Sequence, residues 1–133
     1  TAFKTQLESH DASVEEVIKS AKLLIPKTLR SNHVKLVGSR SHMSEETLNF
    51  VETIKKEGKN VEVVSKGSSL KFCLVAEGLA DVYPRFAPTM EWDTAAGQAI
   101  CNSVGIDVIS QETNESLLYN KESLLNPWFL VSK

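Results

Sequence analysis

Asp93 is the side chain in this sequence with the clearest candidate chemistry. It stands directly before a run of small residues, 94–97 (TAAG). An aspartate in that position predicts a helix N-cap, because its carboxylate can accept the first free N–H groups and meets the positive end of the helix dipole. A cap needs only one carboxylate oxygen, so the other oxygen can bind a cation. Asp93 is therefore the first candidate for a metal ligand.

Three polar loops carry further groups that suit a phosphate ester. They are residues 39–42, 67–71 and 85–93, and each leads into a predicted helix. Glycine and serine at helix N-termini favour anion binding, and cationic side chains add charge-assisted contacts to phosphate. The loops offer Arg40, His42, Lys71 and Arg85. The sequence Gly-Ser-Ser at 67–69 lacks the Gly-Lys-Ser/Thr ending of a P-loop, so nothing supports nucleoside triphosphate binding by that route.

Strand, turn and helix alternate along the chain, which predicts one α/β domain with a mostly parallel or mixed sheet and helices on both faces. In such sheets, ligands bind beyond the carboxyl ends of strands, where the three loops lie. The expected strands are 1–6, 34–37, 60–65, 80–83, 106–109, 116–118 and 128–131. The expected helices are 13–25, 44–57, 70–77 and 93–104.

Two of these helices have apolar residues at helical spacing that predict a buried face. In the first helix, which a capping box at Ser13 and Glu16 should begin, the apolar residues are Val14, Val17, Ile18 and Ala21. In the helix 44–57 they are Leu48, Val51 and Ile54.

Composition and charge narrow the class of protein. The 133 residues are 41% hydrophobic and 24% charged, with 15 basic and 17 acidic residues and a net charge of -2. No basic field attracts nucleic acid, and no apolar run reaches the length of a membrane span. Cys73 and Cys101 lie in apolar segments without metal-ligand spacing, so we expect reduced, buried thiols in a cytoplasmic protein. The start at Thr1, without methionine, predicts a processed or truncated product.

Four segments of the sequence resemble a known family. They are LVGSRSH (36–42), GSSLKFCLVAEGLADVYPRF (67–86), WDTAAGQAI (92–100) and LLNPWFLVS (124–132). They closely resemble the carboxy-terminal domain of CysQ-type 3'(2'),5'-bisphosphate nucleotidases, which are magnesium-dependent, lithium-sensitive phosphatases of the inositol monophosphatase-like superfamily. The resemblance extends from about residue 34 to the end of the chain.

The resemblance implies a role for each matching residue. Asp93 corresponds to the carboxy-terminal metal-binding aspartate of the family. Trp92 is assigned to packing behind its loop. The residues implied to contact the nucleotide substrate are Ser39, His42, Gly67, Ser68, Lys71 and Arg85. The parent enzyme would use Mg²⁺ to convert 3'-phosphoadenosine 5'-phosphate to AMP and phosphate, in the context of sulfate assimilation.

One departure from the family pattern is large. The amino-terminal domain, with its Gly-Glu-Glu segment and Asp-Pro-x-Asp-Gly-Thr motif, has no counterpart in these 133 residues. A lone Asp93 cannot build the several-metal site that such a reaction needs, so we expect this chain to be inactive by itself. Its expected partners are a nucleotide bisphosphate and its own missing amino-terminal domain. An apolar face left uncovered by that domain can also support a homodimer.

Two alternatives stay open. The first is a phosphatase lobe that acts on an inositol phosphate, against which the SRSH and GSSLK segments argue. The second is a free-standing, non-enzymatic nucleotide-binding α/β domain, which would be monodisperse alone and would bind AMP with little need of magnesium.

Overall fold

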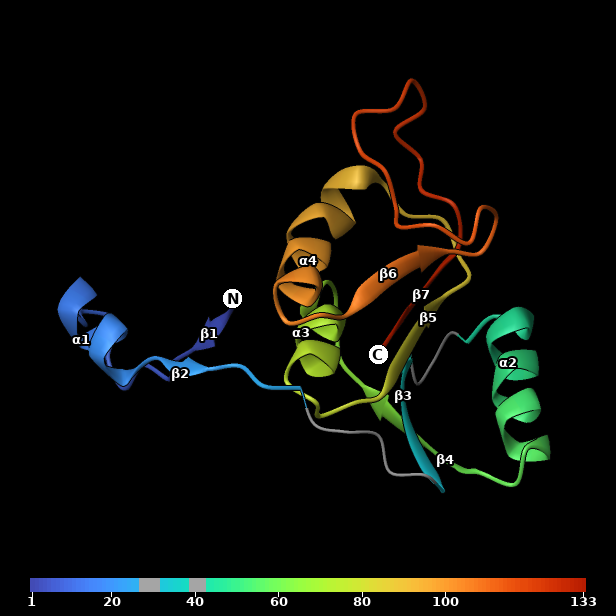
Figure 1. Cartoon of the computed structure of the whole chain (residues 1–133), viewed down its shortest axis with the longest axis horizontal. Helices are drawn as coiled ribbons and strands as arrows, with labels where there is room; N and C mark the ends of the chain where they lie inside the picture. The colour runs from blue at the N-terminus through green and yellow to red at the C-terminus, as the bar shows by residue number, and fades with distance from the viewer. Residues whose placement is uncertain (27–31, 39–42) are drawn as a thin grey trace.

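The protein is built around one five-stranded sheet, seen in a computed structural model that describes residues 1–26, 32–38 and 43–133 (Figure 1). The strand order is β4-β3-β5-β7-β6. The sheet strands are β3 (His33–Gly38), β4 (Asn60–Ser65), β5 (Val82–Arg85), β6 (Asp107–Ser110) and β7 (Phe129–Ser132). The helices are α1 (Val14–Ser20), α2 (Glu45–Lys56), α3 (Leu70–Ala76) and α4 (Glu91–Ser103). Strands β1 (Phe3–Lys4) and β2 (Lys22–Leu23) form a separate two-stranded antiparallel sheet.

The sheet is mixed, which confirms the predicted fold class. Strand β3 is parallel to β4 and β5, whereas β7 is antiparallel to both β5 and β6. Parallel pairing of β3 with β4 and β5 requires crossover connections, and α2 and α3 supply them. Because β4 and β5 run in the same direction, their carboxyl ends and the loops that follow them lie at the same end of the sheet.

Helices cover both faces of the sheet, as the sequence predicts. Helices α3 and α4 lie on one face and α2 lies on the other (Figure 1). Neighbouring residues of a strand point to opposite faces. Val37 and Tyr83 therefore pack into the larger core under α3 and α4, while Leu36 and Val82 pack with α2.

Residues 1–26 form an arm that extends from the body, by which we mean the described residues from 32 onward (Figure 1). The arm contains β1, β2 and α1, and none of its residues is buried. The capping box at Ser13 and Glu16 is present, with the Ser13 N–H donating to the Glu16 carboxylate at 2.7 Å. The predicted buried stripe is wrong, because Val14 is 74% and Ile18 69% exposed.

The ends of several predicted elements shift in the structure. Helix α1 ends at Ser20, well before Pro26, because Ala21 is extended and the next two residues pair with β1. The expected strand at 116–118 is reduced to one bridge between Ile109 and Ser116. Strand β5 begins two residues later than predicted and includes Pro84. A proline fits there because β5 pairs with β3 only through Val82, so no ladder bond to β3 is lost.

Burial of the other predicted core residues is partly confirmed. In α2, Val51 and Ile54 are buried, but Leu48 is 48% exposed and Thr47 is buried in its place. Both cysteines are free thiols; Cys101 is fully buried and Cys73 is half-buried. Burial raises the pKa of Cys101 to about 12.

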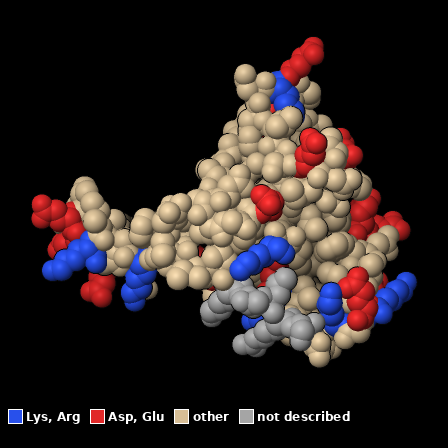
Figure 2. All heavy atoms as spheres, in the orientation of Figure 1, with Lys and Arg blue, Asp and Glu red and all other residues tan. Residues whose placement is uncertain are grey.

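Acidic and basic side chains are interspersed over the face of the molecule seen in Figure 2. Within the described ranges, no helix is both long and apolar enough to cross a membrane.

Candidate functional site

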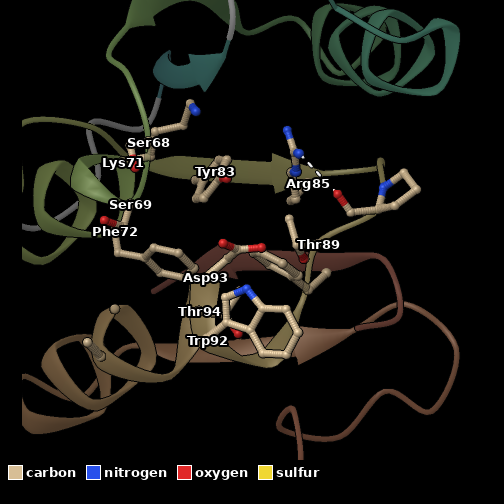
Figure 3. A pocket seen from close by; sticks show the side chains of 14 residues that line it. Ser68, Ser69, Lys71, Phe72, Tyr83, Arg85, Thr89, Trp92, Asp93 and Thr94 are labelled. Atoms are coloured by element: carbon tan, nitrogen blue, oxygen red, sulfur yellow. Dashed lines mark hydrogen bonds between the residues drawn. The ribbon is translucent and has the colours of Figure 1, made fainter. Parts of the chain in front are cut away.

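A cavity of about 510 Å³ lies at the carboxyl end of the sheet, between the start of α3, the end of β5 and the start of α4. In Figure 3, Lys71 and Arg85 lie on one side of it, Trp92 lies on the opposite side, and the Asp93 carboxylate lies between them and points toward Tyr83. Two of the three predicted loops, 67–71 and 85–93, therefore meet at one site, whereas the loop 39–42 lies outside the described residues.

Three aromatic rings form the base of this cavity. Phe72 contacts Tyr83 edge-on, with ring centroids 5.3 Å apart, and stacks on Phe129 at 5.7 Å. All three residues line the cavity and are 5% exposed or less. Gly97 of α4 allows this packing, because a Cβ there would lie 2.5 Å from the Phe72 ring. Gly97, the last small residue of the run after Asp93, thus allows α4 to lie close against α3.

Lys71 and Arg85 give one side of the cavity two positive charges. The Lys71 ammonium lies 5.6 Å from the centre of the Tyr83 ring, and the Arg85 guanidinium donates to the Pro88 carbonyl at 3.2 Å. Burial and then the nearby Arg85 charge lower the pKa of Lys71. Neither cation is paired with a carboxylate in the part of the chain that the structure describes. The pair can therefore receive an anion.

Asp93 is not the N-cap of α4, which corrects the sequence prediction. The helix begins two residues earlier, with Met90 as N-cap, because Met90 is extended and forms a bridge with Leu125. Asp93 is the third helical residue, and its Oδ2 accepts the Met90 N–H at 2.8 Å. One carboxylate oxygen is used as predicted, although by a different hydrogen bond. No hydrogen bond from another described residue reaches the other oxygen.

Trp92 does not pack behind the loop as predicted. Its side chain is 66% exposed and lines the cavity beside Asp93. Thr89 also lines the cavity, and its place in the loop before α4 was the only sign of this in the sequence. A tryptophan next to Asp93 can either pack behind the loop or line the cavity, and the sequence alone could not decide between these two positions for Trp92.

The other predicted binding residues lie in different places. Ser68 lines the cavity and has a positive φ of 51°. Gly67 is exposed and does not line the cavity. Ser39 and His42 lie outside the described residues. The roles assigned to all of these residues remain predictions.

Asp93 provides one suitable ligand for a magnesium ion. Mg²⁺ prefers carboxylate oxygens and usually keeps several waters. The free Asp93 oxygen and the polar cavity fit that preference as one edge of a site. Within residues 1–26, 32–38 and 43–133, no group of three His, Cys, Asp or Glu side chains could hold the ion by itself. The fit is therefore partial.

The fold and the cavity together define an α/β protein with a site that has two cations on one side and one carboxylate. The sequence matches the inositol monophosphatase family over residues 4–129, and the chain belongs to that family. It is 44% identical over 97 residues to the 3'(2'),5'-bisphosphate nucleotidase CysQ of Salmonella typhimurium, a match that covers 73% of this chain and 38% of the relative.

Solved structures give the same relationship. The crystal structure of CysQ from Bacteroides thetaiotaomicron matches with a TM-score of 0.79 and 50% identity, covering 95% of this chain and 46% of that one. Inositol monophosphatase-II of Staphylococcus aureus, at 18% identity and a TM-score of 0.61 over 84% of this chain and 40% of its own, shares the fold. The chain therefore spans less than half the length of these relatives.

Proposed function

We propose that this chain is the carboxy-terminal lobe of a magnesium-dependent phosphatase that hydrolyses 3'-phosphoadenosine 5'-phosphate to AMP and phosphate. The observation that carries the proposal is the meeting of Lys71, Arg85 and Asp93 at one cavity. A substrate with two phosphates needs a cationic site for one phosphate and a metal-binding carboxylate near the other. Both groups line this cavity, with Lys71 and Arg85 on one side and the Asp93 carboxylate between that side and Trp92 (Figure 3).

The cationic side would hold the phosphate that does not react. Lys71 and Arg85 would bind its oxygens through charge-assisted hydrogen bonds, with the Ser68 hydroxyl as a further donor. The resemblance adds Ser39, His42 and Gly67 as contacts to the rest of the nucleotide. Burial raises the pKa of Tyr83, so its hydroxyl stays protonated between the two sides.

Asp93 would hold Mg²⁺ at the reacting phosphate. The bound ion would stabilise charge on the phosphoryl oxygens and lower the pKa of the attacking water. Because Asp93 is a single ligand, the remaining ligands would come from an amino-terminal domain. The 133-residue chain would then be inactive alone.

The arm supports this arrangement. Its exposed apolar side chains are not buried against the body, and an amino-terminal domain would bury them. These side chains are Phe3, Leu7, Val14, Ile18, Leu23 and Ile25. A second copy of the chain could bury these side chains instead. Sedimentation of the 133-residue chain beside the full-length protein distinguishes a second copy from an amino-terminal domain. The two free thiols accord with a cytoplasmic protein.

Phosphate release by the full-length protein tests the proposal. We expect magnesium-dependent turnover of 3'-phosphoadenosine 5'-phosphate that exceeds turnover of inositol monophosphate. Higher turnover of inositol monophosphate would select the inositol-phosphate alternative. AMP binding without any phosphate release would instead favour a non-enzymatic domain.

Lys71 separates the two substrate classes further. In the full-length protein, Lys71→Ala should raise KM for the nucleotide bisphosphate about 10- to 100-fold, because a hydrogen bond to a charged group contributes about 1.5–3 kcal/mol. The KM for inositol monophosphate, which has only one phosphate, should rise less. Lys19→Ala in the arm is the matched control and should leave both KM values unchanged. Equal losses on both substrates would contradict the role given to Lys71.

A further inference from the structure

The loop between β6 and β7 returns to the start of α4 and places one buried side chain there. Asn126 is 4% exposed, although it belongs to a loop. Its Nδ2 lies 2.9 Å from the Met90 carbonyl oxygen and 3.0 Å from the Thr94 hydroxyl. Its backbone N–H donates to the Thr89 carbonyl at 2.8 Å. The loop is thus joined to residues on both sides of the Asp93 turn.

The orientation of the Asn126 amide follows from these neighbours. The Met90 carbonyl oxygen can only accept a hydrogen bond, so the amide nitrogen must face it. The Thr89 hydroxyl, 3.2 Å from the same nitrogen, can also accept. The donor of Asn126 is therefore directed at Met90, the N-cap of α4.

Met90 connects Asn126 with Asp93. Its carbonyl oxygen accepts from Asn126 and, at 3.0 Å, from the Asp93 backbone N–H. Its own N–H donates to the Asp93 Oδ2 at 2.8 Å. The Asp93 carboxylate is consequently held by a residue that Asn126 holds in turn. A rotation of Met90 would turn the carboxylate oxygen that faces the cavity.

We propose that Asn126 is a positioning residue for the Asp93 carboxylate, acting through the backbone of Met90. The inference rests on the proposed function, in which Asp93 is a metal ligand. Carboxylates that bind metals are usually oriented by hydrogen bonds from outside the ligand set, and losing such a partner typically costs about 10- to 100-fold in metal affinity or activity.

Other contacts hold the same loop to α4, so removing the Asn126 donor does not release it. The Glu91 carboxylate accepts the Asn120 N–H at 2.7 Å and pairs with the Lys121 ammonium, which lowers the pKa of Glu91. The Tyr119 hydroxyl donates to the Gln98 side chain at 2.8 Å. These contacts reach α4 without touching Met90.

The test compares Asn126→Asp with Tyr119→Phe in the full-length protein. Asn126→Asp keeps the shape of the side chain but puts an oxygen against the Met90 carbonyl. Tyr119→Phe removes hydrogen bonds between the same loop and α4 but none to Met90. Isothermal titration calorimetry measures the Mg²⁺ Kd without substrate, and phosphate release gives kcat and KM.

We expect Asn126→Asp to raise the Mg²⁺ Kd and to lower kcat, each by about 10- to 100-fold, with KM for the nucleotide nearly unchanged. Tyr119→Phe should leave all three values unchanged. Asn126→Ser removes the same donor and replaces Asn126→Asp if the latter does not fold. Equal Mg²⁺ Kd and kcat for the Asn126 and Tyr119 variants would overturn the inference.

Failure of the inference and failure of the proposed function are distinguishable. If the unaltered protein binds Mg²⁺ but releases no phosphate, the proposed function falls and the calorimetry still decides the role of Asn126. If the unaltered protein binds no Mg²⁺, both are overturned.

Discussion

The arm and the body of this protein bury their side chains to very different extents. The arm has a capped helix and one pair of antiparallel strands, yet none of its residues is buried. The body surrounds its sheet with two apolar clusters and carries every lining residue of the cavity. Regular hydrogen bonding is therefore present in both regions, but only the body has a core.

This difference teaches where each region obtains its stability. An isolated two-stranded hairpin is at best marginally stable in water, and most helical stability comes from packing of an apolar face. The body can meet these conditions by itself. The arm meets them only when another surface covers it. Matched substitutions in the two regions can break or sharpen this contrast.

Removing a phenylalanine should have the largest effect on stability. Phe72 is 1% exposed and Phe3 is 63% exposed. Phe72→Ala should lower the free energy of unfolding of the 133-residue chain by about 3–5 kcal/mol, whereas Phe3→Ala should change it by less than about 0.5 kcal/mol. Urea unfolding followed by tryptophan fluorescence measures both, since Trp92 and Trp128 lie in the body. Similar losses for the two variants would mean that the arm is packed in solution.

Replacing an aspartate should lower catalytic activity in the body but not in the arm. In the full-length protein, Asp93→Asn should lower kcat by at least about 100-fold, which corresponds to about 2.7 kcal/mol in the activation barrier. Folding should be kept, because the amide oxygen of Asn can still accept the Met90 N–H. Asp11→Asn in the arm is the matched control and should leave kcat unchanged. A full-length Asp93→Asn variant with normal kcat and normal Mg²⁺ dependence would refute the metal role.

Removing a helix cap should have the smallest effect on stability, and this effect should still differ between the body and the arm. The Ser44 hydroxyl accepts the Thr47 N–H at the start of α2, and the Ser13 hydroxyl accepts the Glu16 N–H at the start of α1. Losing such a cap costs about 1 kcal/mol.

Ser44→Ala should therefore lower the global unfolding free energy of the 133-residue chain by about 1 kcal/mol. Ser13→Ala should leave it unchanged and only speed amide hydrogen exchange in α1, because we expect the arm to unfold independently of the body. Mass-spectrometric hydrogen exchange measures both. A global loss on Ser13→Ala would show that arm and body unfold together.

Much of the body could be predicted from sequence because its signals are local. Strand β4 has the predicted limits, and the acidic start and basic end of α2 gave that helix to within one residue. The exposure of the arm could not be predicted from the sequence. The spacing of Val14 and Ile18 indicates that one face of the helix is apolar, but it does not indicate which surface covers that face. Burial depends on a partner surface, which local spacing does not contain.

Long-range contacts explain the errors at the candidate site. The start of α4 was misplaced because Met90 is held extended by Leu125, which is distant in sequence. The contacts of Asn126 with Met90 and Thr94 were missed for the same reason. Asp93 was singled out because its local motif and the resemblance both point to it. Its hydrogen bond was assigned wrongly, and its role as a metal ligand stays a prediction.

Magnesium-dependent phosphate release from 3'-phosphoadenosine 5'-phosphate, compared between the 133-residue chain and the full-length protein, tests the central claim most directly. That claim is that Asp93 and the cationic side of the cavity form one half of a phosphatase site. We predict release by the full-length protein and none by the 133-residue chain at the same concentration. Phosphate release by the 133-residue chain alone, or none by the full-length protein, would contradict it.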